Sequence, residues 1–405
     1  MRRRPLDFLA ILYITVWTVS PPLQIAMIYR LLALGCAGIL FIKNGFAMTK
    51  QHGYAMFFCV LVAVSAYIKT GSATAMLSQI GIYMLFIGYV MNYWYEFYWE
   101  DFKGIVPIIL LLLALWNFRT VQALATDANA ARFVVRNDEL ANSYLLSGVG
   151  GYALMYCQVI IVPAIVAWIF SALKNNKKYF ACGVVWVVSF IAYLGEAGYS
   201  IAVVATFISI VVLFTYKQRS IVPALLLSGV ILALLVYLIG FNDTFRDFLL
   251  DAFNGTKVAK KIADITSTIT TDETADSIAV RIARYSFSVQ SFFFKYPLIG
   301  GWWKGGAGGH SVMLDAFGQY GVFGGLIMFR MIYCVTDIWK KYEINAKMMS
   351  VVNATIISIS LVAWLDTIPY NLSMMLLVIL PIILSTLDSW SRQDEYLMDS
   401  QFNTY

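Results

Sequence analysis

Charged residues are scarce in this sequence. Its 405 residues include 29 Lys and Arg and 23 Asp and Glu, so only 13% are charged, against about 25% in soluble domains. Hydrophobic residues make up 60% of the chain, and the mean hydropathy is +0.73. So few charges cannot cover a surface that faces water. The composition therefore excludes a soluble enzyme and predicts a chain solvated mostly by lipid.

Cysteine and histidine are also scarce, which limits disulfide and metal chemistry. The five cysteines all lie in apolar runs without a CxxC spacing, so no disulfide framework is indicated. The two histidines, His52 and His310, are predicted on opposite sides of the membrane and cannot share a metal ion. The first outer connection, residues 20–22, lacks a carboxylate, which argues against a metal-dependent membrane glycosyltransferase with acidic residues there. We expect neither a metal nor a cofactor.

Long apolar runs are the main feature that is present. About 12 occur, and a membrane helix needs roughly 20 residues. They lie near 6–20, 23–42, 54–68, 73–95, 104–118, 151–173, 179–194, 198–216, 221–241, 311–336, 348–365 and 369–387. The predicted fold class is therefore an all-α polytopic integral membrane protein, with about 12 transmembrane helices and two long loops on one side.

Lys and Arg indicate the orientation, because short cytoplasmic loops hold an excess of them. With the N-terminus inside, fifteen of the 29 lie on inner segments and eleven lie in the two long outer loops. Both termini are therefore predicted to be cytoplasmic. The predicted layout has transmembrane helices in 1–118, an outer loop at 119–150, helices in 151–241, a large outer loop at 242–310, helices in 311–387 and a cytoplasmic tail at 388–405.

The eleven cations of the long loops are not required by the topology, since long loops are translocated largely regardless of charge. They allow two interpretations, namely ordinary solvated loops or a basic surface that holds an anionic ligand. The large loop opens with an amphipathic segment, in which Phe245, Leu249 and Phe253 recur every four residues, predicted to lie on the bilayer surface. The polar stretch 266–276 that follows is predicted to be a loop. Its carboxylates offer a weaker alternative, a cation site.

A second helix is predicted from Asp276 to just before Pro297. One face of it is apolar and consists of Ile278, Ile282, Tyr285, Val289 and Phe292. The other face carries cations and hydroxyls, at Arg281, Arg284, Ser288, Ser291 and Lys295. Guanidinium groups bind phosphate oxygens bidentately, so two arginines one turn apart suit a pyrophosphate. The alternative is a surface helix with its polar face in water.

A glycine-rich segment and a histidine follow this helix. Trp302 and Trp303 suit the headgroup interface, Lys304 adds a cation, and the glycines allow backbone N–H groups to approach an anion closely. His310 stands at the start of the next apolar run. A helix N-terminus disfavours the protonated ring, so His310 is predicted to stay neutral and able to accept a proton.

These residues resemble a known family. An Arg-bearing helix in a long outer loop, the Pro-Leu-Ile-Gly-Gly run at 297–301 and a histidine that opens a span are similar to the Wzy-type O-antigen polymerases and the related O-antigen ligases. Both long loops also contain the Arg-x15-Gly spacing typical of that family's third and fifth outer loops, from Arg132 to Gly148 and from Arg284 to Gly300. The resemblance is clearest over residues 280–325.

Two departures from the family bear on the choice of function. The residue after the histidine is Ser311, where the family often has Asn, so an orienting amide is missing. The link 195–200 carries Glu196 and no arginine, whereas ligases commonly place a Ser-Arg turn there. This difference favours a polymerase over a ligase.

The resemblance implies a GT-C-like glycosyltransferase in the bacterial inner membrane with a periplasmic active site. It would join undecaprenyl-pyrophosphate-linked oligosaccharide repeat units into O-antigen or capsule, by metal-independent inverting transfer. Donor and acceptor glycolipids, membrane lipids and a chain-length regulator protein are the implied partners, and no nucleic acid is expected. His310 is the candidate base, with Glu196 as the alternative. The other candidate site residues are Arg281, Arg284, Arg132, Arg136, Arg30, Lys295, Lys304, Trp302 and Trp303.

Arg30 lies within an apolar run, where an arginine is by default functional or paired. It would contact the lipid pyrophosphate or pair with Glu196 or Asp366. A lipid-linked oligosaccharide flippase is the alternative from a different class. The chain shows no internal repeat, and its candidate residues lie on one side, which both argue against a transporter.

Overall fold

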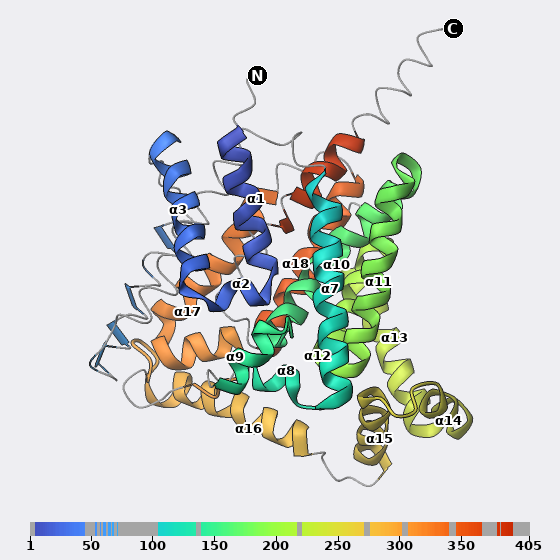
Figure 1. Cartoon of the computed structure of the whole chain (residues 1–405). Helices are drawn as coiled ribbons and strands as arrows, with labels where there is room; N and C mark the ends of the chain where they lie inside the picture. The colour runs from blue at the N-terminus through green and yellow to red at the C-terminus, as the bar shows by residue number, and fades with distance from the viewer. Residues whose placement is uncertain are drawn as a thin grey trace, which may run out of the picture.

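The computed structural model describes residues 5–44, 104–134, 139–216, 221–270, 276–301, 307–339, 346–366 and 379–391 except 381, with isolated positions between 53 and 71. All regular structure in these residues is helical (Figure 1). The prediction of an all-α membrane-embedded chain is therefore confirmed for the described part. The number of spans stays a prediction, because the run at 73–95 lies outside the described residues, and those at 54–68 and 369–387 lie partly outside them.

Six described helices are long and apolar enough to cross a membrane. They are α7 (Ile105–Thr126), α10 (Tyr152–Asn175), α11 (Lys177–Ala197), α13 (Val222–Phe241), the Val312–Arg330 part of α17 (Val312–Trp339) and the Met348–Leu365 part of α18 (Ala346–Leu365). Shorter apolar helices occur at α1 (Pro5–Val19), within α3 (Met27–Asn44) and at α12 (Ser200–Thr215). A five-residue helix, α2 (Pro21–Ile25), joins α1 to α3.

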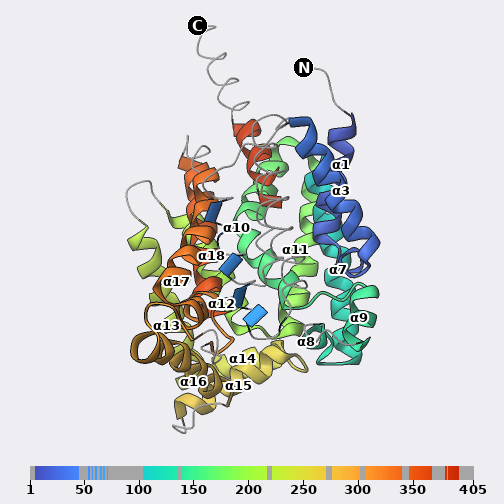
Figure 2. The same ribbon diagram turned by 90° about the vertical axis from the view of Figure 1, so that its left-hand side faces the viewer.

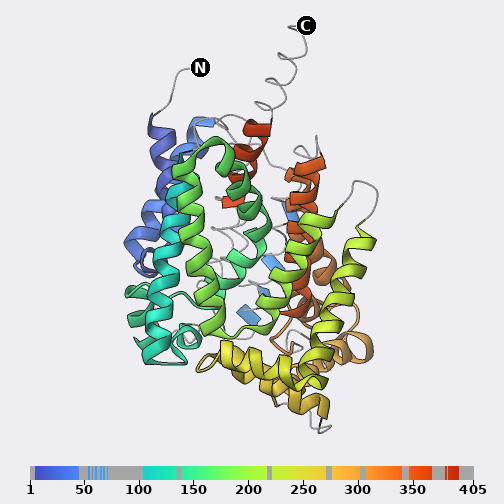
Figure 3. The same ribbon diagram turned by 90° about the vertical axis from the view of Figure 1, so that its right-hand side faces the viewer.

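Helix α10 occupies the centre of the bundle and α13 its rim. In the apolar stretch of α10 78% of the residues are buried, because α11, α12 and α18 pack around it (Figure 2). Only 17% of the corresponding stretch of α13 is buried, and α13 stands at one side of the molecule (Figure 3). Side chains such as Leu226 and Val230 on α13 are therefore placed to face lipid.

A polar network joins three helices inside the bundle. Asn117 of α7 and Gln158 of α10 exchange amide hydrogen bonds of 2.9 and 2.8 Å. Trp186 of α11 donates to the side-chain amide oxygen of Gln158 at 2.9 Å, and Asn117 also donates to the hydroxyl of Ser189. All four side chains are buried. Because lipid offers no competing partners, such a network fixes α7, α10 and α11 relative to one another.

Short helices gather at one end of the bundle, opposite the end where α1 begins (Figure 1). We call this the loop end. Its helices are α8 (Ala130–Phe133), α9 (Glu139–Leu146), α14 (Asp243–Ala252), α15 (Lys257–Thr270), α16 (Asp276–Gln290) and a π-helical turn, η3 (Ser291–Lys295). Both long segments predicted to lie on one side of the membrane thus contribute to the same end.

The helices of the loop end agree with the predictions in part. Helix α14 is the expected amphipathic helix, and the Asn242 side chain caps it by accepting the N–H of Phe245 at 2.9 Å. The loop predicted from residue 266 is wrong as far as Thr270, because α15 continues there. Ile262 of α15 is buried and α15 packs on α13 and α11, so tertiary contact outweighs the polar composition.

Candidate functional site

Helix α16 and the turn η3 bury the hydroxyls of the predicted polar face. Ser288 and Ser291 are buried, whereas Ile282 on the predicted apolar face is 55% exposed. The Ser288 hydroxyl donates to Asp315 of α17 at 2.6 Å, and that of Ser291 donates to the Gly318 carbonyl at 3.2 Å. The hydroxyls of the predicted polar face therefore pack against α17, whereas its cations Arg284 and Lys295 stay exposed. Lipid, which solvates apolar side chains, is the natural environment of the outward face.

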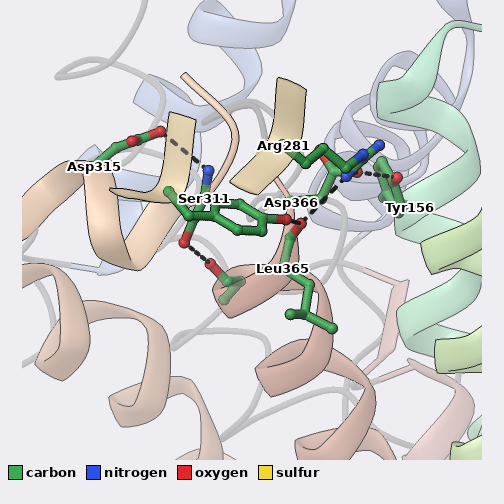
Figure 4. A network of polar contacts seen from close by, with 8 residues as sticks. Tyr156, Arg281, Ser311, Asp315, Leu365 and Asp366 are labelled. Atoms are coloured by element: carbon green, nitrogen blue, oxygen red, sulfur yellow. Dashed lines mark hydrogen bonds and ion pairs between the residues drawn. The ribbon is translucent and has the colours of Figure 1, made fainter. Parts of the chain in front are cut away.

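Arg281 reaches the end of α18. Its guanidinium lies 3.3 Å from Asp366 Oδ2, and the carboxylate is almost fully buried. The hydroxyl of Tyr156, on α10, donates to the same carboxylate oxygen (Figure 4). Tyr285 donates its hydroxyl to the Leu365 carbonyl. Arg281 and Tyr285 of α16 thus donate to the Leu365 carbonyl at the C-terminus of α18, where the last carbonyls lack helical partners.

His310 precedes α17 and lies beside α16. It is partly buried. Burial lowers the pKa of His310, and the nearby charges of Arg284 and Arg281 lower it further, while Asp366 and Asp315 oppose this change. The protonated ring is therefore disfavoured in the folded chain, the same direction as the sequence argument expects. The causes found are burial and two arginines, where the sequence argument relied on the helix N-terminus.

Close backbone contact joins the His310 segment to α16. A Cβ atom added at Gly308 would lie 2.1 Å from the Arg284 carbonyl oxygen, so only glycine fits there. This contact brings Arg284 and His310 together. Arg284 itself is exposed, so its guanidinium is accessible to a ligand at the loop end.

The Pro-Leu-Ile-Gly-Gly run is packed against a break in α17. Gly300 and Gly321 both have positive φ, +73° and +67°. A Cβ at Gly300 would lie 2.2 Å from the Gln319 carbonyl oxygen, and one at Gly321 would lie 2.2 Å from that of Leu298. Backbone hydrogen bonds from Gly301 to Gly318 and from Val322 to Pro297 join the segments. These glycines allow the two backbone segments to pack closely within the protein. The sequence interpretation had assigned the glycines only to anion binding.

A second cationic group lies where the two predicted loops meet. Lys257, at the start of α15, donates to the Ala128 carbonyl ahead of α8. Burial lowers the pKa of Lys257, and the neighbouring charge of Arg132 lowers it further, while Glu196 and Asp127 oppose this change. Arg132, Lys257 and Glu196 are thus neighbours. Glu196 belongs to this group, so the structure does not bring it together with His310.

A tyrosine stack lies between the two groups. The rings of Tyr152 and Tyr199 stack with centroids 4.2 Å apart, and Tyr156 lies 6.2 Å from Tyr199. Tyr156 hydrogen-bonds to Asp366, and Tyr199 lies within electrostatic reach of Arg132. The stack therefore connects the Arg132 side of the loop end to the Arg281–Asp366 side.

The remaining predicted residues are placed as follows. Lys295 is exposed, and its ammonium lies 5.9 Å from the centre of the Phe287 ring. Arg30 is in α3, but its side chain lies outside what the structure describes. Arg136, Trp302, Trp303 and Lys304 fall outside the described residues.

Sequence reasoning did not find the roles of Tyr156, Tyr199 and Asp315. Asp366 was considered only as a partner for Arg30, and the structure shows that it pairs with Arg281. A carboxylate at the end of an apolar run was the one available signal for Asp366. Among the residues that the structure describes, no group of three or more His, Cys, Asp or Glu side chains is placed to hold a metal ion.

The fold and this cluster define a helical membrane protein with a polar site of mixed charge at one end of its bundle. Comparisons with protein-family models, with curated proteins and with solved structures find no match to the chain. The function therefore has to be argued from the residues of the loop end.

Proposed function

We propose that the chain is a glycosyltransferase that polymerises lipid-linked oligosaccharide repeat units at the periplasmic face of the bacterial inner membrane. The observation that carries the proposal is the proximity of Arg284 to His310. An exposed guanidinium and an imidazole with a lowered pKa belong to backbone segments in direct contact, at the end of a bundle of apolar helices. Glycosyl transfer from a lipid pyrophosphate needs one group that stabilises the leaving pyrophosphate and one that accepts a proton.

The reaction needs one proton transfer and one bond exchange. A sugar hydroxyl of one glycolipid attacks the anomeric carbon of another, and the bond from that carbon to the pyrophosphate oxygen breaks with inversion. Polyprenyl pyrophosphate leaves with the electron pair, and His310 takes the hydroxyl proton. Arg284 stabilises the negative charge on the leaving group. The cationic side chains take the place that a metal ion has in other phosphate chemistry.

Arg281 has a different role from Arg284 in this scheme. Its guanidinium is held by Asp366 and by the end of α18, so its charge is already balanced in the absence of substrate. Arg281 therefore orients α16, and Arg284 and Arg132 are the cations exposed for binding pyrophosphate. Arg132 belongs to the other loop and lies with Lys257, where a second glycolipid would bind.

The outward face of α16 fits a substrate with a lipid tail. Phe287 is exposed on α16, Phe293 and Phe294 are exposed on the turn η3, and Leu298 is exposed beyond them. An apolar face of this kind lies in the acyl region of the bilayer while the charged residues face its surface. A pyrophosphate at the headgroup level, with its polyprenyl chain in the membrane, would then meet Arg284 directly.

The test uses purified protein in lipid nanodiscs with a lipid-linked repeat unit as both donor and acceptor. We expect glycolipids of increasing length without added metal, and no chain growth with Arg284→Ala or His310→Ala. Arg246→Ala is the matched control, because this loop-end arginine pairs with Asp243 at 2.5 Å on α14, away from the site. Transfer to a lipid A core acceptor instead of growing chains would indicate a ligase. Movement of intact glycolipid across the bilayer without transfer would indicate a flippase.

A further inference from the structure

One carboxylate holds both sides of the segment that carries His310. Asp315 Oδ1 accepts the N–H of Gly308 at 3.1 Å, and Oδ2 accepts the N–H of Ser311 at 3.1 Å. The bond to Ser311 is drawn in Figure 4. Since His310 lies between these two residues, its backbone is held at both ends by a side chain in the first turn of α17.

The same carboxylate ties this segment to α16. Asp315 Oδ1 also accepts the Ser288 hydroxyl at 2.6 Å, and the Ser288 oxygen in turn accepts the N–H of Gly308 at 2.8 Å. Ser288 lies one helical turn after Arg284 and is fully buried. A closed set of three hydrogen bonds therefore links α16, α17 and Gly308, two residues before the histidine.

We propose that Asp315 is a positioning residue, which holds the His310 segment in register with Arg284 on α16. The effect of Asp315 on catalysis rests on the function proposed above. Its effect on the position of the His310 segment does not. A carboxylate in the first turn of a helix also stabilises that helix through its dipole. This helix-stabilising role alone would leave the surroundings of His310 unchanged, so the two roles can be separated by experiment.

Asparagine cannot replace Asp315 fully. The carboxylate accepts three hydrogen bonds with its two oxygens, and an amide would turn one oxygen into an NH₂ donor facing an N–H. Asp315→Asn therefore breaks the hold on Gly308 or on Ser311 while keeping the side-chain volume. Ser288→Ala is the complementary change, since it removes the link to α16 and leaves the bond to Ser311.

The experiment measures how accessible the His310 ring is in the folded protein. The chain has two histidines, so His52→Gln leaves His310 as the only one. The rate of its modification by diethyl pyrocarbonate is followed by mass spectrometry, above the pH at which the ring is protonated. We expect Asp315→Asn to raise this rate severalfold, because the released segment opens locally, and Ser288→Ala to raise it less.

Asp264→Asn is the control, because this carboxylate pairs with Lys261 on α15 and is remote from the histidine segment in sequence. An unchanged rate in folded Asp315→Asn protein overturns the proposal. If that variant does not fold, an unchanged rate in Ser288→Ala overturns it. Should the rate rise while His310→Ala still polymerises glycolipids, the proposed function fails and the positioning role stands. If His310→Ala loses polymerisation while the modification rate is unchanged in both Asp315→Asn and Ser288→Ala, the positioning role fails and the proposed function stands.

Discussion

Arg281 and Asp366 are 85 positions apart in the sequence and form an ion pair of 3.3 Å at the loop end of the bundle. The aspartate side chain is 6% exposed and that of the arginine 32%. Tyr156 donates a further hydrogen bond to the carboxylate. The pair therefore joins α16 to the membrane-embedded helices α18 and α10, and it orients the helix that carries Arg284.

We expect removal of Arg281 to lower the stability of the protein more than neutralisation of Asp366 does. Arg281→Met leaves a buried carboxylate without its cation, and we expect a loss of about 3 kcal/mol in stability, the low end for breaking a buried pair. Asp366→Asn leaves a neutral amide that still accepts from Tyr156, so the loss is smaller. The double variant regains part of the loss. Thermal unfolding of the detergent-solubilised protein measures these differences, and strictly additive effects would contradict the pairing.

The apolar helices could be predicted from sequence because lipid imposes a minimum length on every spanning helix. Helix α16 was predicted as well, with its cations and hydroxyls on one face. Its orientation was not predictable from periodicity. The same pattern fits a helix whose polar face meets water and one whose apolar face meets lipid. The structure adds that Ser288 and Ser291 bond to α17, while Arg284 on the same face stays exposed.

The long-range pairs of the site could not be read from sequence either. The sequence offered only Arg30 as a partner for Asp366, and nothing local to Asp366 pointed to Arg281. Asp315 looks like an ordinary acidic residue in the first turn of a helix. Its role depends on Gly308 and Ser288, which come from different segments. Such contacts follow from packing between helices, which leaves little signal in a single sequence.

The lowered pKa of His310 has a consequence for pH dependence. Burial, Arg284 and Arg281 disfavour the protonated ring in the folded chain. The unfolded chain therefore binds more protons below about pH 6.5, so folding stability falls as the pH drops below that value. Glycosyl transfer that needs a neutral base persists somewhat below it, and is lost only as the pH falls through the lowered pKa.

Replacing Arg284 by Met should raise the pKa of His310 towards its ordinary value, because one of the two opposing positive charges is removed. The change is read by NMR titration of the single histidine in a His52→Gln background. Arg246→Met is the control, and we expect it to leave the titration unchanged. A pKa that stays the same in Arg284→Met would show that the two side chains are not neighbours.

The buried amide pair of Asn117 and Gln158 lies away from the candidate site, so we expect its removal to change stability and not activity. Asn117→Ala removes three hydrogen bonds among α7, α10 and α11. Hydrogen bonds between membrane helices contribute about 0.6–2 kcal/mol each, so we expect a lower unfolding midpoint with an unchanged rate of glycosyl transfer at low temperature. A loss of activity without a loss of stability would place this network in the mechanism instead.

The glycine contact at the break in α17 predicts a sharp difference between two Gly→Ala variants. At Gly321 the added methyl group would meet the Leu298 carbonyl at 2.2 Å, and φ is +67°, so the backbone must shift. We expect Gly321→Ala to separate the 297–301 run from α17 and to lower chain growth about 100-fold, since a small misplacement of catalytic groups has that effect.

Gly195 of α11 is the matched control, because nothing lies within 4 Å of its added methyl group. Gly195→Ala should keep full activity and gain about 0.5–1 kcal/mol from the better helix former. Equal activity of the two variants in the nanodisc assay would mean that docking of the run does not support the site.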